Sequence, residues 1–356
     1  MLLHLLSMKF TASQADLSSA LKTISRAVSN GRTHKVLAGA LLTATSDGNL
    51  AVTGYDLELG ITTTITASVE TPGSTVIPHR LLSEITSRLD GALTVSVADA
   101  GDRCDIASTS GSYSLSCDAA DDFPDLPTLD AATGACMALQ GVLPAVLPAC
   151  STDESKAILQ GVRVVCDGAA CSLAATDGHR LVMRSVDSDT PAMALTVPAR
   201  AMALLREPVT VASDAAHVSF TAGDTTITSR ILTGTYPNVA QLVPERFDHT
   251  ATVDRVAFLR ALERIAVIAD SHNSVVKITD GKLTAETETS SGAESIAVDG
   301  NLPNIAANVH YLLDGVKGFT GSQLQIRANT STTPVVLADP DDDVNIYLVM
   351  PVQVKS

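Results

Sequence analysis

Apolar positions follow two different periods along this chain. Three short runs alternate apolar with polar residues, as half-buried strands do; they cover residues 50–56, 171–177 and 282–288. Two longer stretches repeat their apolar residues every three or four positions, which predicts amphipathic helices. One is residues 16–28, with Leu17, Leu21, Ile24 and Val28 on one face; the other is residues 254–270, with Val256, Leu259, Leu262 and Ile265. The pattern predicts a sheet-rich α+β fold.

A segment downstream of each strand run occurs three times, at intervals of about 115 to 120 residues. Its copies are residues 77–85, residues 197–205 and, more diverged, residues 308–314. Each predicts a strand end that turns into a short helix, and the proline in the first two copies suits a first helical turn. A second repeated motif, aromatic–Pro–Asp/Asn, lies near the end of each of the first two repeats, at residues 123–125 and 236–238.

The repeat predicts three modules of one kind, each a sheet with two helices on one side. Their bounds are residues 8–129, 130–247 and 248–356. The six expected helices are residues 15–28, 79–90, 137–151, 198–207, 253–270 and 308–319. The third of these should be short or bent, because Pro144 and Pro148 interrupt it. Three long repeats suit an arc or ring of domains better than a solenoid.

The composition is that of a folded chain, with 45% hydrophobic and 18% charged residues. No apolar stretch is long enough to cross a bilayer, and residues 1–7 lack the features of a signal peptide, so we expect a cytoplasmic protein and no membrane partner. The six cysteines are scattered without a Cys-x-x-Cys pair. We therefore expect reduced, mostly buried thiols, no metal site and no cofactor.

The charge is unevenly distributed. A net charge of −15 argues against binding a polyanion, but the six expected helices hold ten of the 24 basic residues and only eight of the 39 acidic ones. Basic helices on an acidic body could accept DNA on the helical face. The same excess could arise because Arg and Lys favour helices, and composition does not separate these readings. No zinc finger, basic zipper or aromatic platform is present, so any DNA contact should be independent of sequence.

Several local motifs point to one family. They are residues 8–11 (Met-Lys-Phe-Thr), Ala175 to Leu181 (Ala-Thr-Asp-Gly-His-Arg-Leu), residues 123–127, residues 236–238 and residues 347–352. In this order, and on top of the threefold repeat, the sequence from Met8 onward resembles the bacterial DNA sliding clamp, the β subunit of DNA polymerase III. Residues 1–7 would then be an upstream extension.

The resemblance implies a non-enzymatic processivity factor. Two copies would assemble head to tail into a six-module ring around double-stranded DNA, with the helices lining the hole. The expected partners are the DNA polymerase III catalytic subunit, the clamp loader, and other polymerases and repair proteins that carry short linear motifs.

The resemblance also implies a hydrophobic pocket for partner peptides. Its residues would be Leu159, Thr176, Gly178, His179, Arg180, Leu181, Pro237, Gln241, Leu242, Pro334, Leu348, Met350, Pro351 and Val352. Gln241 and Gln353 stand where the family often has Arg, so the rim should be less basic and the peptide preference shifted. Without the resemblance, most of these apolar residues would be interpreted as ordinary core.

The same resemblance implies two further surfaces. The dimer contact would join Tyr113 and Leu115, on an edge strand of the first module, to Val267 and Ile268, after the opening helix of the third. DNA would meet Lys22, Arg26, Arg32, Arg80, Lys156, Arg200, Arg260 and Arg264.

Two other functions compete with this one. Asp177, Gly178 and His179 could form the acid–base turn of a hydrolase, although no nucleophile stands at a recognisable spacing. The chain could also be a purely structural repeat protein with no role on DNA.

Overall fold

The three-module repeat is present in the computed structural model, which describes residues 6–32, 34–98, 102–129, 136–270, 273–340 and 342–353. Each module runs through the same order of elements: a strand, a helix, several strands, a second helix and three more strands, to which the first module adds a short fourth. The expected order of six helices is confirmed. Within the described ranges, no helix is long and apolar enough to span a bilayer.

The first module contains two helices and ten strands. They are β1 (Leu6–Ser13), α1 (Gln14–Ile24), β2 (Gly39–Ala44), β3 (Asn49–Tyr55), β4 (Leu59–Thr66), β5 (Ser68–Thr71), β6 (Gly73–Pro78), α2 (His79–Thr86), β7 (Ala92–Ala98), β8 (Arg103–Ala107), β9 (Ser112–Ser116) and β10 (Asp118–Ala119). Of the expected upstream extension, residues 1–5 lie outside the described residues. β1 begins two residues before Met8.

The second module has shorter helices. Its elements are β11 (Cys136–Met137), α3 (Leu143–Val146), the 3₁₀ turns η4 (Leu147–Ala149) and η5 (Glu154–Gln160), β12 (Gly161–Cys166), β13 (Ala170–Thr176), β14 (Arg180–Asp187), β15 (Met193–Pro198), α4 (Ala199–Met202), β16 (Val209–Ser213), β17 (His217–Ala222), β18 (Thr225–Arg230) and η6 (Val239–Leu242). The predicted shortening of the opening helix is confirmed: α3 has four residues and passes into η4 at the second proline. α4 is also only four residues long, much shorter than the predicted 198–207.

The third module has the longest helix. Its elements are β19 (His249–Asp254), α5 (Arg255–Ala269), β20 (Val275–Thr279), β21 (Lys282–Glu286), β22 (Ser291–Ser295), β23 (Val298–Gly300), β24 (Ile305–Asn308), α6 (Val309–Lys317), β25 (Gln323–Ala328), β26 (Val335–Ala338) and β27 (Ile346–Val349). Asp254 caps α5 by accepting a hydrogen bond from the Ala257 N–H at 2.7 Å.

The buried faces of the two long opening helices match the sequence pattern to different degrees. On α1 the predicted Leu17, Leu21 and Ile24 are buried. On α5 the prediction is partly wrong, because Val256 is 39% exposed and Phe258 is buried instead. The buried face of α5 is therefore displaced around the helix axis from the predicted face. It includes Ala261, Ala266 and Ala269, which the prediction left out.

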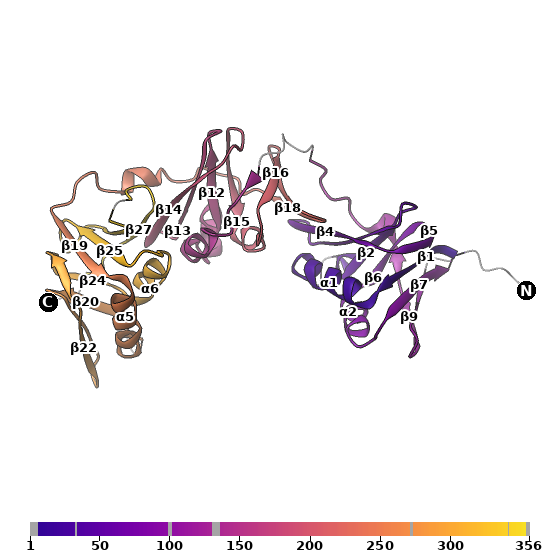
Figure 1. Cartoon of the computed structure of the whole chain (residues 1–356), viewed down its shortest axis with the longest axis horizontal. Helices are drawn as coiled ribbons and strands as arrows, with labels where there is room; N and C mark the ends of the chain where they lie inside the picture. The colour runs from indigo at the N-terminus through magenta and orange to yellow at the C-terminus, as the bar shows by residue number, and fades with distance from the viewer. Residues whose placement is uncertain are drawn as a thin grey trace, which may run out of the picture. The chain divides into compact units, whose positions relative to one another are not determined.

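The chain divides into two compact units, residues 1–134 with 209–230 and residues 135–208 with 231–356. The first contains the sheets β5-β1-β7-β8-β9 and β10-β6-β2-β3-β4-β18-β17-β16, and the second contains β15-β12-β13-β14-β27-β26-β25-β19-β23 and β22-β21-β20-β24. All these pairings are antiparallel. In the first unit α1 and α2 pack together on the β2–β4 sheet, and in the second α5 and α6 pack together beside β20–β22 (Figure 1).

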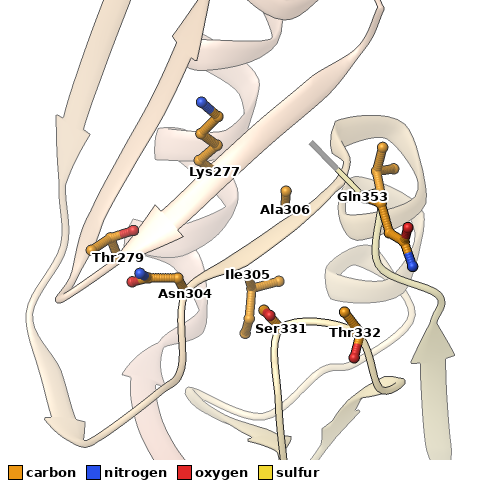
Figure 2. Close-up of a pocket in the computed structure, with 9 residues that line it drawn as sticks. Lys277, Thr279, Asn304, Ile305, Ala306, Ser331, Thr332 and Gln353 are labelled. Carbon is orange, nitrogen blue, oxygen red and sulfur yellow. The ribbon is translucent and has the colours of Figure 1, made fainter. Parts of the chain in front are cut away.

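A backbone contact after the last strand of each module also repeats. In the first module Asp118 pairs with Val76. In the third, the Val352 N–H donates to the Ala306 carbonyl at 2.7 Å. Val352 and Gln353 there border a hollow in the sheet surface (Figure 2).

One expectation about cysteine is wrong. Cys166 and Cys171 form a disulfide with Cα atoms 4.1 Å apart, whereas Cys104, Cys117 and Cys150 are buried thiols. The register of β12 and β13 places the two bonded residues directly opposite each other across a tight hairpin. Sequence spacing alone does not reveal this pairing, because it depends on strand register.

We predict that the disulfide adds little stability. It closes a short loop that the hairpin already restrains, so dithiothreitol should lower the free energy of unfolding by about 2 kcal/mol at most. Urea denaturation with and without reductant measures this change. Iodoacetamide added to the unfolded chain should label Cys166 and Cys171 only after reduction; labelling of both without reductant would contradict the pairing.

Candidate functional site

The turn between β13 and β14 is rigidly held by its own side chains. The Asp177 carboxylate accepts hydrogen bonds from the backbone N–H groups of His179 and Arg180, at 2.8 and 3.1 Å. The Thr176 hydroxyl donates to the Arg180 carbonyl at 2.6 Å. Gly178 has a φ of +95°, a conformation that L side chains rarely adopt. The turn therefore presents its backbone in one fixed shape.

Arg180 connects this turn to the third module. Its guanidinium donates to Asp177 at 3.1 Å, to Asp314 on α6 at 2.5 Å and to the Tyr347 hydroxyl on β27 at 3.4 Å. It also lies 4.5 Å from the ring centroid of Tyr311. Its side chain is only 12% exposed. A buried cation with two carboxylates and an aromatic face fixes α6 and β27 against the turn.

The pKa values in this cluster reflect burial and charge. Burial alone would lower the pKa of Arg180, but the Tyr347 hydroxyl and the two carboxylates raise it above its usual value. Burial raises the pKa of Tyr347 to about 12, despite the opposing effect of Arg180. Arg180 therefore stays charged and Tyr347 neutral at physiological pH.

The C-terminal strand brings distant pocket candidates together. Leu181 on β14 pairs with Leu348 on β27. Beyond the strand, the Met350 N–H donates to the His179 carbonyl at 2.8 Å. Residues 176–181 and 348–352 are thus neighbours in space, as the resemblance implied.

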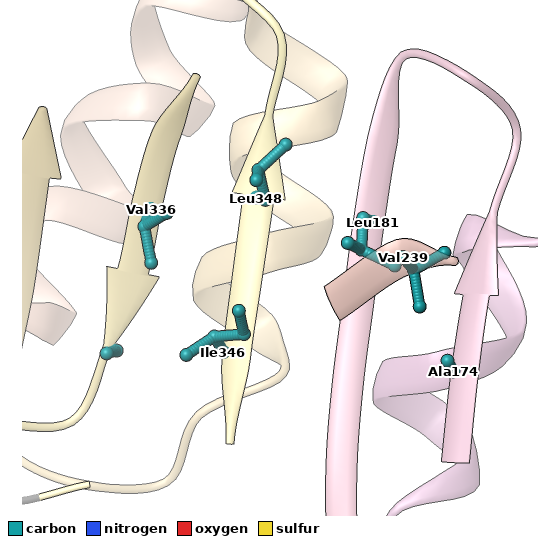
Figure 3. Packing of buried hydrophobic residues seen from close by; sticks show 7 residues of the cluster. Ala174, Leu181, Val239, Val336, Ile346 and Leu348 are labelled. Atoms are coloured by element: carbon teal, nitrogen blue, oxygen red, sulfur yellow. The ribbon is translucent and has the colours of Figure 1, made fainter. Parts of the chain in front are cut away.

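An apolar cluster lies on the sheet beside this junction. Leu181, Val239, Val336, Ile346 and Leu348 are buried in it and come from three strands and η6 (Figure 3). The cluster is bordered by side chains that remain open to solvent. Of the predicted pocket residues, Leu242 is 51%, Met350 40% and Val352 36% exposed.

The remaining pocket candidates surround this cluster less closely. Leu159 and Pro334 are half-buried and precede β12 and β26 of the same sheet. Pro237 and Gln241 are exposed in and before η6, and Pro351 is half-buried in the tail. These positions are compatible with the rim of a pocket.

Residues of the third module complete the site, and the sequence analysis missed their part in it. Tyr311 and Asp314 on α6, with Tyr347, hold Arg180 in place. The copy at 308–314 was recognised as a helix, and the spacing of Tyr311 and Asp314 puts both on one helical face. That pair on one face of the helix was the available signal.

The turn does not form an acid–base pair. Asp177 accepts from the backbone N–H of His179 rather than from its ring, and its other oxygen is held by Arg180. The exposed imidazole instead lies roughly parallel to the Tyr311 ring, with centroids 6.3 Å apart. The geometry gives no support to the hydrolase alternative.

The basic candidates for DNA contact differ in availability. Seven of the eight are exposed; Lys156 is half-buried, and its ammonium donates to the Asp177 carbonyl at 3.1 Å. Lys156 thus supports the turn. Arg80 and Arg264 form surface ion pairs with Glu84 and Glu294. The described α-helices are shorter than the predicted ones and contain seven basic and four acidic residues.

The predicted dimer residues lie at two open sheet edges. β9 is the edge strand of its sheet, with Tyr113 44% exposed and Leu115 half-buried. β22 is the edge strand of the sheet that α5 covers. Val267, 74% exposed, and Ile268 belong to the last turn of α5 and do not follow the helix as expected.

We predict that replacing Arg180 by Ala lowers the free energy of unfolding by about 3 kcal/mol, because Asp177 and Asp314 lose a buried charge partner. Arg180→Lys should lose less, since it keeps the charge without the planar fork. Urea denaturation monitored by circular dichroism measures both. Arg206→Ala, at an exposed position, is the matched control, and an equal loss in that variant would refute the role given to Arg180.

Comparison with known proteins identifies the family. The three domains of the DNA polymerase III beta subunit match in order: the N-terminal domain over residues 8–127, the central domain over 137–238 and the C-terminal domain over 240–353.

Individual relatives agree with these matches. The beta sliding clamps of Synechocystis sp. and Synechococcus elongatus are 36% and 37% identical, and each alignment covers 98% of this chain and 100% of the relative. The crystal structure of the DNA polymerase sliding clamp from Bacillus subtilis, 26% identical, superposes with a TM-score of 0.93 over 98% of this chain and 100% of that one. The chain therefore belongs to the DNA polymerase III beta subunit family, the bacterial sliding clamps that serve as processivity factors in DNA replication.

Proposed function

We propose that two copies of this chain close into a ring around double-stranded DNA and tether polymerases through a peptide pocket at the β14–β27 junction. The observation that carries the proposal is the way modules join. β18 of the second module pairs with β4 of the first, and β27 of the third pairs with β14 of the second. Each junction pairs the last strand of one module with a strand of the preceding module. The strands that accept it, β4 and β14, occupy the same position in the repeat.

The repeat leaves two strands without such a junction. By position, β9 is the third strand after the second helix of the first module, as β18 and β27 are in theirs, and β22 corresponds to β4 and β14; both β9 and β22 are sheet edges among the described residues. Applying the junction rule a third time joins β22 of one copy to β9 of another. Two such contacts close a head-to-tail ring of six modules.

The repeat also fixes the register of this contact. At the β14–β27 junction Val182 pairs with Tyr347. Tyr113 occupies the repeat position of Tyr347. Tyr113 pairs with Ile106 on β8, and Tyr347 pairs with Leu337 on β26, the equivalent strand of the third module. Gly292 holds the place of Val182. Tyr113 of one copy should therefore lie opposite Gly292 of the other, where the absence of a side chain leaves room for the ring.

The helix behind β22 supports this contact. A Cβ atom at Gly292 would lie 3.1 Å from side-chain atoms of both Ile265 and Ile268, so α5 packs directly on the strand. Val267 in the same turn is largely exposed and offers an apolar contact to an incoming strand. We propose Tyr113, Leu115, Val267 and Ile268 as the centre of the dimer interface.

DNA would be held by charge alone. The helices carry a small positive excess on an acidic chain, and we propose that Lys22, Arg26, Arg32, Arg80, Arg200, Arg260 and Arg264 meet phosphates. Lys156 contributes less, because its ammonium already bonds to the turn. Contacts of this kind are sequence-independent and exchange rapidly, which lets a closed ring slide.

The pocket would take short linear motifs. We propose that the DNA polymerase III catalytic subunit, the clamp loader, other polymerases and repair proteins dock their Leu or Phe anchors there. An adaptable floor of Leu, Val and Met beside a rigid turn suits such anchors. The site comprises the fourteen residues named for it above, with Tyr311 and Asp314 positioning Arg180.

The remaining assignments follow from this role. We propose module bounds at residues 8–129, 130–247 and 248–356, and a cytoplasmic, nucleoid-associated location. The chain would act by binding and would catalyse no reaction.

The pocket is tested with a fluorescent polymerase tail peptide that contains Leu and Phe. Met350→Ala should weaken its binding about thirty-fold, the loss typical of an interface hot spot of about 2 kcal/mol. Fluorescence anisotropy gives the dissociation constants. Val344→Ala removes an exposed apolar side chain at another site and should bind normally. Equal affinity of wild type and Met350→Ala would disprove the pocket.

The ring is tested at its edge strand. Tyr113→Asp should weaken the dimer at least about thirty-fold, because it places a charge in the apolar centre of the contact. Sedimentation equilibrium reports the mass at each concentration. Ser110→Asp adds the same charge at the exposed β8–β9 turn and should remain dimeric. A wild-type chain that is monomeric at micromolar concentration would exclude the ring.

A further inference from the structure

The segment that leaves the first module covers the outer face of its own sheet. Phe123 is 5% exposed and packs with Leu37, Tyr55 and Val76. Further along, Leu126 lies over Gly60, where a Cβ atom would stand only 2.6 Å from its side chain. The segment therefore crosses the sheet from β6 to β4.

The second module is covered in the same way. The Tyr236 hydroxyl donates to the Ala174 carbonyl at 3.3 Å, and Val239 is buried in the apolar cluster. Burial raises the pKa of Tyr236. Both covering segments share one pattern, aromatic–Pro–Asp/Asn–aliphatic, at residues 123–126 and 236–239.

Strand register identifies the corresponding surface of the third module. Leu41 pairs with Thr53 on one side and Val76 on the other. Lys277 pairs in the same way with Thr284 and Ala306. Lys277 thus takes the place of Leu41, beneath the path that the segment from Phe123 to Leu126 follows in the first module.

This surface of the third module carries two hollows, and no described segment with the aromatic–Pro pattern crosses it. One hollow of about 470 Å³ lies around Ile305, Ala306 and Lys277 (Figure 2). A second of about 610 Å³ extends from Lys277 towards Ser291 on β22. Ser291 corresponds to Gly60, the residue under Leu126. The two hollows therefore follow the path of the covering segment from end to end.

The chemistry of the first hollow indicates an acidic occupant, whereas the second contains Glu286 as well as Lys277. Lys277 is exposed, lines both hollows and is the only charged residue among those that line the first. Within the described residues its ammonium has no hydrogen bond or ion pair. Ile305 and Ala306 supply a small apolar floor, and Thr279, Asn304 and Ser331 supply polar groups around it.

We infer that the third module carries a second docking site for an extended segment of a partner protein, next to the pocket at the β14–β27 junction and sharing Val352 with it. The segment has an aromatic–Pro pattern with an adjacent acidic residue, like the chain's own covering segments. Its aromatic side chain lies over Ala306 and the aliphatic stem of Lys277, and its carboxylate pairs with the ammonium.

The probe is a fluorescein-labelled peptide with the sequence of residues 120–128, which carries three aspartates around Phe-Pro. It is titrated with the full-length chain and followed by anisotropy, up to a protein concentration of about 1 mM, because a free peptide lacks the effective concentration of a tethered one. Saturable binding is expected. A peptide with Ser in place of the Phe should bind at least about ten-fold more weakly.

The site is assigned by charge reversal. Lys277→Glu should weaken binding of the peptide about ten-fold or more, whereas Lys282→Glu, an exposed lysine on the neighbouring strand that lines neither hollow, should change it less than about two-fold. Both variants should bind the polymerase tail peptide like wild type. Unchanged binding of the probe to Lys277→Glu would overturn the proposal.

Two further outcomes exclude other occupants. Met350→Ala should bind the probe normally, and excess polymerase tail peptide should not displace it; displacement would assign the probe to the pocket. A chain that ends at Gln353 should bind the probe as the full chain does. If it binds at least about ten-fold more tightly, the chain's own last residues occupy the hollows and the partner site is refuted.

Discussion

The backbone pairing between modules is the constraint on which the structure depends. At both junctions the last strand of one module completes the sheet of the module before it, so neither sheet is finished until the next module has folded. Pairing of this kind satisfies backbone groups that would otherwise be open to water or to another chain. It also accounts for the position of the proposed peptide pocket. The β14–β27 junction brings a turn from the second module and the tail of the third to one place, and Arg180 fixes them there.

Much of the architecture follows from sequence pattern, because each module must bury the same faces. The threefold repeat, the order of the helices and the effect of Pro144 and Pro148 could all be inferred from local spacing. What could not be inferred depends on register or on distant partners. Cys166 and Cys171 pair because a hairpin places them opposite each other. Asp314 and Tyr347 reach Arg180 from 134 and 167 residues away.

The three copies of the module differ at one position of the outer sheet face. Leu41, Arg163 and Lys277 occupy one position in the repeat, and each matches what lies above it. The apolar Leu41 lies beneath the segment from Phe123 to Leu126. A cation lies near Tyr236, whose pKa it lowers against the larger effect of burial. The third copy keeps the cation and leaves it exposed. A binding site in a repeat protein can thus arise where one copy of the module lacks the segment that covers the other copies.

The composition of the two edge strands has a consequence for the proposed ring. β9 reads Ser-Tyr-Ser-Leu-Ser and β22 reads Ser-Gly-Ala-Glu-Ser, so hydroxyl groups and a carboxylate alternate with few large apolar side chains. Strands of this kind are well hydrated when parted and are poor templates for stacking with unrelated chains. The same hydration would lower the work needed to part β9 from β22 in the proposed ring.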